Sequence, residues 1–244
     1  MRARTAIRPG TGLRDKLQRA LSTGDVLLVE GNTRVATAIK YLTQSTWSHS
    51  ALHVGPIPGK TEPDGEPHVL IEALVEEGVI SAPLSKYRDF HTRICRPLAL
   101  SEAERRKVAD FCIERIGYQY DTKNIVDLAR YLLPTPPVPT RFRRRMIALG
   151  SGEPTRAICS TLIAQAFQLV RYPILPRVDY VHDPDSPVKD PEAQKEILRI
   201  RHHSLFTPRD FDISPYFSIV KPTIEAGFDY TQIPWAGPVE DAAA

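Results

Sequence analysis

Residues 158–170 read ICSTLIAQAFQLV, a run in which a cysteine stands where a loop gives way to an apolar helix. The preceding residues 150–154, GSGEP, predict the loop. Apolar side chains then recur at helical spacing, at Leu162, Ile163, Ala166, Phe167 and Val170. We therefore expect a buried helix over residues 159–170 that carries Cys159 in its first turn.

The position of Cys159 favours a reactive thiol. Backbone N–H groups in the first turn of a helix lack intrahelical partners, and together with the helix dipole they favour the thiolate. The alternative is a small packing residue, because free cysteine is among the most buried residue types. Cys95, in a strand-like segment, and Cys112, in a helical run, are expected to be packing residues. Three cysteines without a close CxxC pair argue against a disulfide framework and a cysteine-rich zinc site.

A nucleophilic cysteine needs a base, and residues 47–55, WSHSALHVG, offer His49. Residues 50–54 predict a short strand, so His49 stands at its start, where a side chain can reach across a cleft. His53 shares a strand face with His49 and is a rival base, although a buried, hydrogen-bonded role fits its position better. Spacing of four on a strand separates the two rings widely, so we expect no metal site.

Glu72 interrupts the apolar run VLIEALV at residues 69–75. A carboxylate among such neighbours is costly unless it is paired. Orienting a catalytic imidazole and stabilising its charged form would provide that pairing. The alternative is that Glu72 points to solvent from a half-exposed strand.

The order histidine, glutamate, cysteine resembles the YiiX/YebB-like branch of the NlpC/P60 superfamily of papain-like cysteine hydrolases. The segments that carry this resemblance are residues 23–28, TGDVLL; 47–50, WSHS; 69–73, VLIEA; 116–121, IGYQYD; 158–160, ICS; 207–211, TPRDF; and 214–215, SP. The resemblance implies a circularly permuted papain fold of the α+β class, in which an antiparallel sheet packs against helices and the nucleophile begins a helix.

The resemblance also implies roles for single residues. Cys159 would be the nucleophile, His49 its base and Glu72 the partner that orients the base. Tyr120 matches the tyrosine of a Gly-x-x-Tyr-Asp element and would line the pocket or help to hold an oxyanion. Three residues beside the histidine and the cysteine complete the expected substrate site: Trp47, Ser48 and Ser160. No metal or organic cofactor is implied.

The chain is expected to contain one catalytic domain, over residues 23–222, between an N-terminal extension (1–22) and a C-terminal tail (223–244). Helices are expected at residues 13–21, 33–43, 101–116, 125–133 and 159–170. Strands are expected at 24–30, 50–54, 69–74, 79–82 and 92–96, as in an antiparallel meander. Residues 177–191, rich in Asp and Pro, predict a surface loop, and 134–157 predict a lid or specificity loop.

Composition sets the compartment and the partners that we expect. A chain of 244 residues with 42% hydrophobic content can bury one sizeable core. Residues 1–9 lack an apolar stretch long enough for a secretory signal, so a cytoplasmic enzyme is the default expectation. The net charge is only +3, but a basic cluster gathers within residues 141–145. It comprises Arg141, Arg143, Arg144 and Arg145.

Three interpretations of that basic cluster compete: a solvated loop, a peripheral contact with an anionic membrane, or a holder of an acidic substrate group. Nucleic acid is not expected, because no aromatic residues interleave a basic surface. The sequence therefore predicts a cysteine hydrolase that cleaves an amide, ester or thioester of a small-molecule, peptide or lipid substrate through an acyl-enzyme. The alternatives are a lipid acyltransferase at a membrane and a non-catalytic binding module that keeps the cleft.

Overall fold

The computed structural model describes residues 11–74, 76–119, 158–182 and 194–222, and these ranges form a mixed α+β fold, as the sequence predicts. The helices are α1 (Thr11–Ala20), α2 (Arg34–Thr43), α3 (Glu102–Ile113), α6 (Ile158–Leu169) and α7 (Pro208–Asp212), with short 3₁₀ helices η1 (Leu84–Tyr87) and η3 (His203–Leu205). The strands are β1 (Val26–Val29), β2 (His49–His53), β3 (His68–Leu74), β4 (Gly78–Pro83), β5 (Thr92–Pro97), β6 (Arg177–His182), β7 (Gln194–Arg199) and β8 (Phe217–Val220).

Six of these strands form one antiparallel sheet in the order β4-β3-β2-β1-β5-β8. The predicted meander is thus confirmed over β1 to β4, whereas β5 crosses back to pair with β1. All residues of β1 are buried, which explains why its sequence, VLLV, is apolar on both faces. Val29, the last residue of β1, pairs with His49, the first residue of β2. His49 therefore stands at one end of the sheet.

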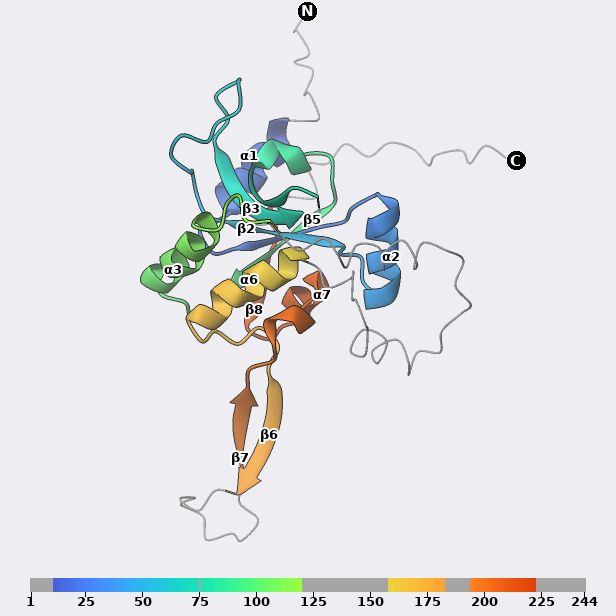
Figure 1. Ribbon diagram of the computed structural model, residues 1–244, viewed down its shortest axis with the longest axis vertical. Coiled ribbons are helices and arrows are strands. Elements are labelled where there is room, and N and C mark those ends of the chain that lie inside the picture. Colours follow the sequence, from blue (N-terminus) through green and yellow to red (C-terminus); the bar gives the residue numbers. More distant parts are fainter. Residues whose placement is uncertain (1–10, 75, 120–157, 183–193, 223–244) are drawn as a thin grey trace, which may run out of the picture.

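The sheet separates two cores (Figure 1). On one face α3, α6 and α7 pack against it, and a first cluster joins Leu28 and Leu52 of the strands to Phe167 and Phe211 of the helices. On the other face α1 and η1 cover a second, smaller cluster that includes Leu27. The side chains of a strand alternate between the two cores, so residue parity decides which layer each one meets.

Local sequence signals explain where the helices begin and end. A capping box between Ser101 and Glu104 starts α3, as the sequence predicts. The helix ends at Ile113 rather than at residue 116. The chain turns shortly after this end, at Gly117, which adopts φ 89° and donates its N–H to the Val79 carbonyl at 2.8 Å.

The loop predicted for residues 177–191 is wrong over its first part. Residues 177–182 form β6, which pairs antiparallel with β7 in a separate two-stranded ribbon that projects from the body (Figure 1). Among the described residues the ribbon buries little: Val178 and Leu198 are more than two-fifths exposed. Its strands rest on their own pairing and on ion pairs of Asp179 with Arg177 and Arg199. No element was predicted over β7, α7 or β8.

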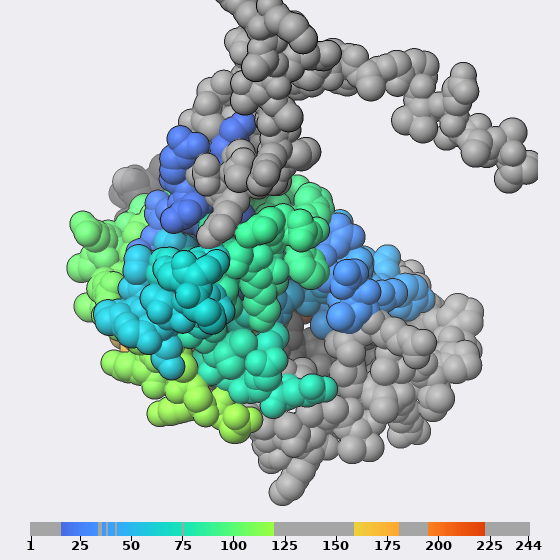
Figure 2. Space-filling view, turned by 90° about the horizontal axis from the view of Figure 1, so that it is seen from above, coloured from blue at the N-terminus to red at the C-terminus, as the bar shows by residue number. Residues whose placement is uncertain are grey.

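The space-filling view shows one end of the molecule, with α2 in blue beside the green residues that follow β4 and a hollow between them (Figure 2). Within the described ranges, no helix has the length and apolar character needed to cross a bilayer.

The predicted helix at 125–133 and the segment 134–157 lie outside the described residues, as do Tyr120 and the basic cluster at 141–145.

Candidate active site

The start of β2 and the start of α6 meet at the end of the sheet. Cys159 is the second residue of α6 and is only 4% exposed. The residues that follow the histidine and the cysteine touch each other, since Ser50 Oγ and Ser160 Oγ lie 3.2 Å apart. Ser50 faces α6 because it alternates with His49 along β2. Packing of α6 on the sheet thus brings the predicted nucleophile to the predicted base.

Glu72 lies on the same sheet face as His49. Leu52 pairs with Ile71, so Glu72 neighbours Ala51, two residues along β2 from His49. Diagonal neighbours of this kind are within reach of long side chains. His49 Nε2 lies 2.6 Å from Glu72 Oε2. Nε2 therefore hydrogen-bonds to the carboxylate, and Nδ1 is the ring nitrogen that remains to interact with the thiol.

Glu72 is fully buried and has three partners, which excludes the solvent-facing alternative. His49 and the Tyr87 hydroxyl both donate to Oε2, and Lys86 Nζ lies 2.5 Å from Oε1. Burial opposes the negative charge, but the hydrogen bonds and charges of His49 and Lys86 lower the pKa of Glu72 to about 2. The carboxylate is thus ionised at neutral pH.

Sequence reasoning missed Lys86 and Tyr87, which belong to η1. They come from the first half of the β4–β5 connection, and nothing in the local sequence marks them as partners of a buried carboxylate. The alternation in β3 places Glu72 on the face that η1 covers, so the pairing depends on the register between strands. A search for polar residues after β4 would have suggested them only once that register was known.

The thiol and the imidazole favour each other's charged forms. Burial opposes the thiolate, but the charge of His49 and hydrogen bonds from His49 and Ser50 lower the pKa of Cys159 to about 7. Burial likewise opposes the imidazolium, but Cys159 and then Glu72 raise the pKa of His49 to about 10. Between these values the pair is a thiolate and an imidazolium.

The other two cysteines show the opposite behaviour. Burial raises the pKa of Cys112 to about 12, and it also raises the pKa of Cys95. Both side chains are fully buried in the core, as packing residues are. Cys159 alone among the three has a lowered pKa, and the difference comes from its neighbours His49 and Ser50 rather than from exposure.

Trp47 and Ser48 hold the chain just before His49. The Trp47 indole N–H donates to Asp212 of α7 at 3.0 Å, and Ser48 Oγ accepts from the Gly31 N–H at 2.8 Å. Both side chains are buried. A Cβ on Gly31 would lie 2.8 Å from Ser48 Oγ, so the close approach requires glycine there. Contact of Trp47, Ser48 or Ser160 with a substrate stays a prediction.

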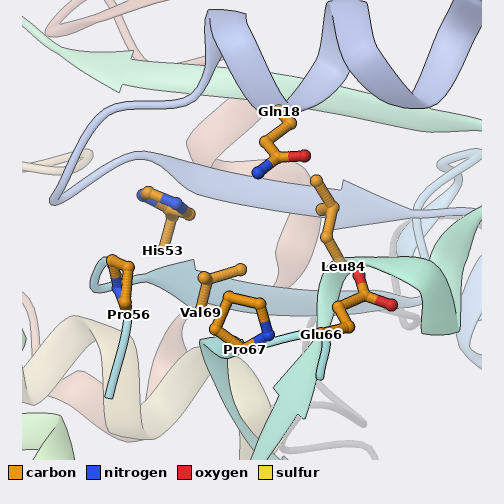
Figure 3. Close-up of a pocket in the computed structure, with 7 residues that line it drawn as sticks. All are labelled: Gln18, His53, Pro56, Glu66, Pro67, Val69 and Leu84. Carbon is orange, nitrogen blue, oxygen red and sulfur yellow. The ribbon is translucent and has the colours of Figure 1, made fainter. Parts of the chain in front are cut away.

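His53 lies apart from this site. It lines a cavity of about 270 Å³ near α1, together with Gln18, Glu66 and Leu84 (Figure 3). Burial lowers its pKa, and its Nδ1 is buried with no hydrogen-bond partner among the described residues. The structure therefore gives the position next to the thiol to His49 rather than to His53. In the described ranges, no three His, Cys, Asp or Glu side chains gather as metal ligands.

The chain has limited similarity to known proteins. No described protein family matches the sequence, and no curated protein is significantly similar to it. Among solved structures, the chain is similar to one described as metalloprotein yiiX from Escherichia coli O157:H7, DUF1105. The two share 14% identity with a TM-score of 0.44, over 82% of this chain and 96% of that one.

Proposed function

We propose that the protein is a cysteine hydrolase that cleaves an amide, ester or thioester through a covalent acyl-enzyme on Cys159. The observation that carries the proposal is the chain of contacts from Cys159 to His49 to the buried, ionised Glu72. A thiol of lowered pKa, next to a base that is itself held by a third group, is the arrangement that nucleophilic catalysis requires.

The geometry supports a two-step reaction. The Cys159 thiolate attacks the carbonyl carbon, and the first backbone N–H groups of α6 stabilise the oxyanion that forms. The bond to the leaving group then breaks, and its electron pair takes the proton from the imidazolium of His49. Neutral His49 next removes a proton from water, which attacks the thioester and releases the acid.

The acceptor in the second step decides between hydrolysis and acyl transfer. If an amine or an alcohol enters in place of water, the same residues make an acyltransferase. A lipid acyltransferase at a membrane and a non-catalytic binding module are thus the alternatives to hydrolysis. We propose hydrolysis first because its second step needs only water, whereas acyl transfer needs a site for a further substrate.

An acyl-enzyme trap tests the proposal. We expect p-nitrophenyl acetate to release p-nitrophenol in a burst and to leave an acetyl group on Cys159, located by peptide mass spectrometry, followed by steady turnover. The Cys159→Ala variant should lose both phases, and His49→Ala should lose the burst. Acetylation of Cys159 without turnover would favour acyl transfer. An added amine or alcohol should then act as the acceptor and start turnover. No acetylation of Cys159 would leave only the binding module.

A further inference from the structure

Two cations hold the two oxygens of one buried carboxylate in the candidate site. His49 Nε2 is bound to Glu72 Oε2, and Lys86 Nζ lies 2.5 Å from Oε1. Glu72 is fully buried, whereas the Lys86 side chain is 36% exposed at the rim of the site. Tyr87, the next residue of η1, donates its hydroxyl to Oε2 and so fixes the carboxylate from the same element.

These groups balance their charges before the reaction. The resting site holds a thiolate on Cys159, an imidazolium on His49, a carboxylate on Glu72 and an ammonium on Lys86, and their formal charges sum to zero. Lys86 supplies one of the two positive charges. Without it, a largely buried group of side chains would carry a net negative charge, which is costly.

The balance also holds in the acyl-enzyme. There the sulfur is bound to the acyl group and is neutral, and His49 has given its proton to the leaving group. Only Glu72 and Lys86 remain charged, and they compensate each other. If Lys86 were absent, Glu72 would be a buried negative charge with only protonated His49 to compensate it. His49 would then bind its proton more tightly. That proton is the one that the leaving group needs.

We propose that Lys86 is a positioning residue that compensates the charge of Glu72 whenever His49 is neutral, and thereby allows His49 to act as the acid for the leaving group. The inference rests on the proposed function and adds to it a group that regulates its proton transfer. Lys86 acts through Glu72 and needs no contact with the substrate.

The test follows the His49 ring in a protein that imitates the acyl-enzyme. Cys159 is first carbamidomethylated, which removes the thiolate, and the pH titration of His49 is then recorded by NMR with ¹⁵N-labelled histidine. We expect the midpoint of His49 to rise by about one pH unit in Lys86→Met, because a nearby positive charge has gone. Lys86→Arg should restore the midpoint of the unsubstituted protein.

A matched control separates this effect from a general loss of positive charge. Lys40 is 26% exposed and pairs with Glu30 at 3.1 Å, so it compensates a carboxylate other than Glu72. Lys40→Met should leave the His49 midpoint unchanged. An equal midpoint in Lys86→Met and in the unsubstituted protein, or an equal rise in Lys40→Met, would overturn the proposal. If Lys86→Met does not fold, Lys86→Gln and Lys86→Arg give the same comparison.

A substrate series distinguishes this proposal from the proposed function. Lys86→Met should lower kcat for anilides, whose leaving group needs the proton, more than for p-nitrophenyl esters, whose leaving group does not. Equal losses for both would overturn the role of Lys86 while leaving the hydrolase intact. A Cys159 that forms no acyl-enzyme would end the proposed function, whereas the NMR midpoints would still show whether Lys86 controls His49.

Discussion

His49 Nε2 and Glu72 Oε2 lie 2.6 Å apart because β2 and β3 pair in a register that sets the two side chains diagonally on one sheet face. Cys159 reaches the same imidazole from α6, on the opposite face. His49 links the two layers because it is the first residue of β2 and stands at the end of the sheet. The site is thus built where two layers meet, rather than within either one.

Loss of the Glu72 charge should weaken the thiolate at Cys159. In Glu72→Gln we expect the pKa of His49 to fall, because a carboxylate that raises it has been removed. Fewer molecules then carry the imidazolium that stabilises the thiolate at pH 7. Turnover of an ester should drop by about 10²-fold or more, a loss of the size expected for impaired acid–base catalysis. Unchanged turnover in a folded Glu72→Gln protein would show that the carboxylate is not part of the machinery.

Glu72 should also make the free energy of unfolding depend on pH, with a loss of stability at low pH. Its pKa is lowered in the folded state, so the stabilisation is fully present above about pH 4.5 and is lost as the pH falls towards about 2. We expect about 3 kcal/mol of the free energy of unfolding to depend on this group. Urea unfolding of the protein and of Glu72→Gln checks this, and the two curves should converge at low pH. A constant difference across the range would contradict it.

Ser50 should tune the thiol without being essential. Its hydrogen bond to Cys159 contributes to the lowered pKa of the thiol, after the larger effect of His49. Ser50→Ala should therefore raise the pKa of Cys159 by less than His49→Ala does. Thiolate absorbance in the ultraviolet, followed against pH, measures both shifts. A larger shift in Ser50→Ala than in His49→Ala would reverse the ranking that the structure implies.

Gly31 should be needed for the position of His49. The new methyl of Gly31→Ala would lie 2.8 Å from Ser48 Oγ and 2.9 Å from the Ala36 Cβ, so the chain before His49 must shift. We expect a loss of about 1–3 kcal/mol in stability, as for other overpacked sites, and slower labelling of Cys159. Thermal unfolding and iodoacetamide labelling measure the two effects. A variant with unaltered stability and labelling would show that the contact is relieved without moving β2.

Much of this arrangement follows from local sequence patterns. Apolar spacing after Cys159 predicted α6, and the position of His49 before a strand signal placed it near the sheet end. A lone carboxylate in an apolar strand predicted that Glu72 would be buried with a partner, and it is. These inferences succeed because each depends on the residue and its neighbours along the chain.

The rest depends on packing between distant segments. Lys86 reaches Glu72 only because η1 covers the face on which β3 presents the carboxylate, and no local pattern carries that register. β6 was mistaken for a loop because Asp and Pro crowd the segment that begins with it, and no element was predicted over β7. β8 is a short edge strand whose partner, β5, lies far upstream.

The most direct test of the account is the rate at which iodoacetamide labels Cys159 as a function of pH, measured by mass spectrometry in the unsubstituted protein and in His49→Ala. We predict a rise centred near pH 7 for Cys159, while the buried Cys112 stays unlabelled as an internal control. In His49→Ala the rise should move to higher pH. A Cys159 that labels like an ordinary thiol, with a midpoint of about 8.5, and that is indifferent to His49→Ala would contradict the account.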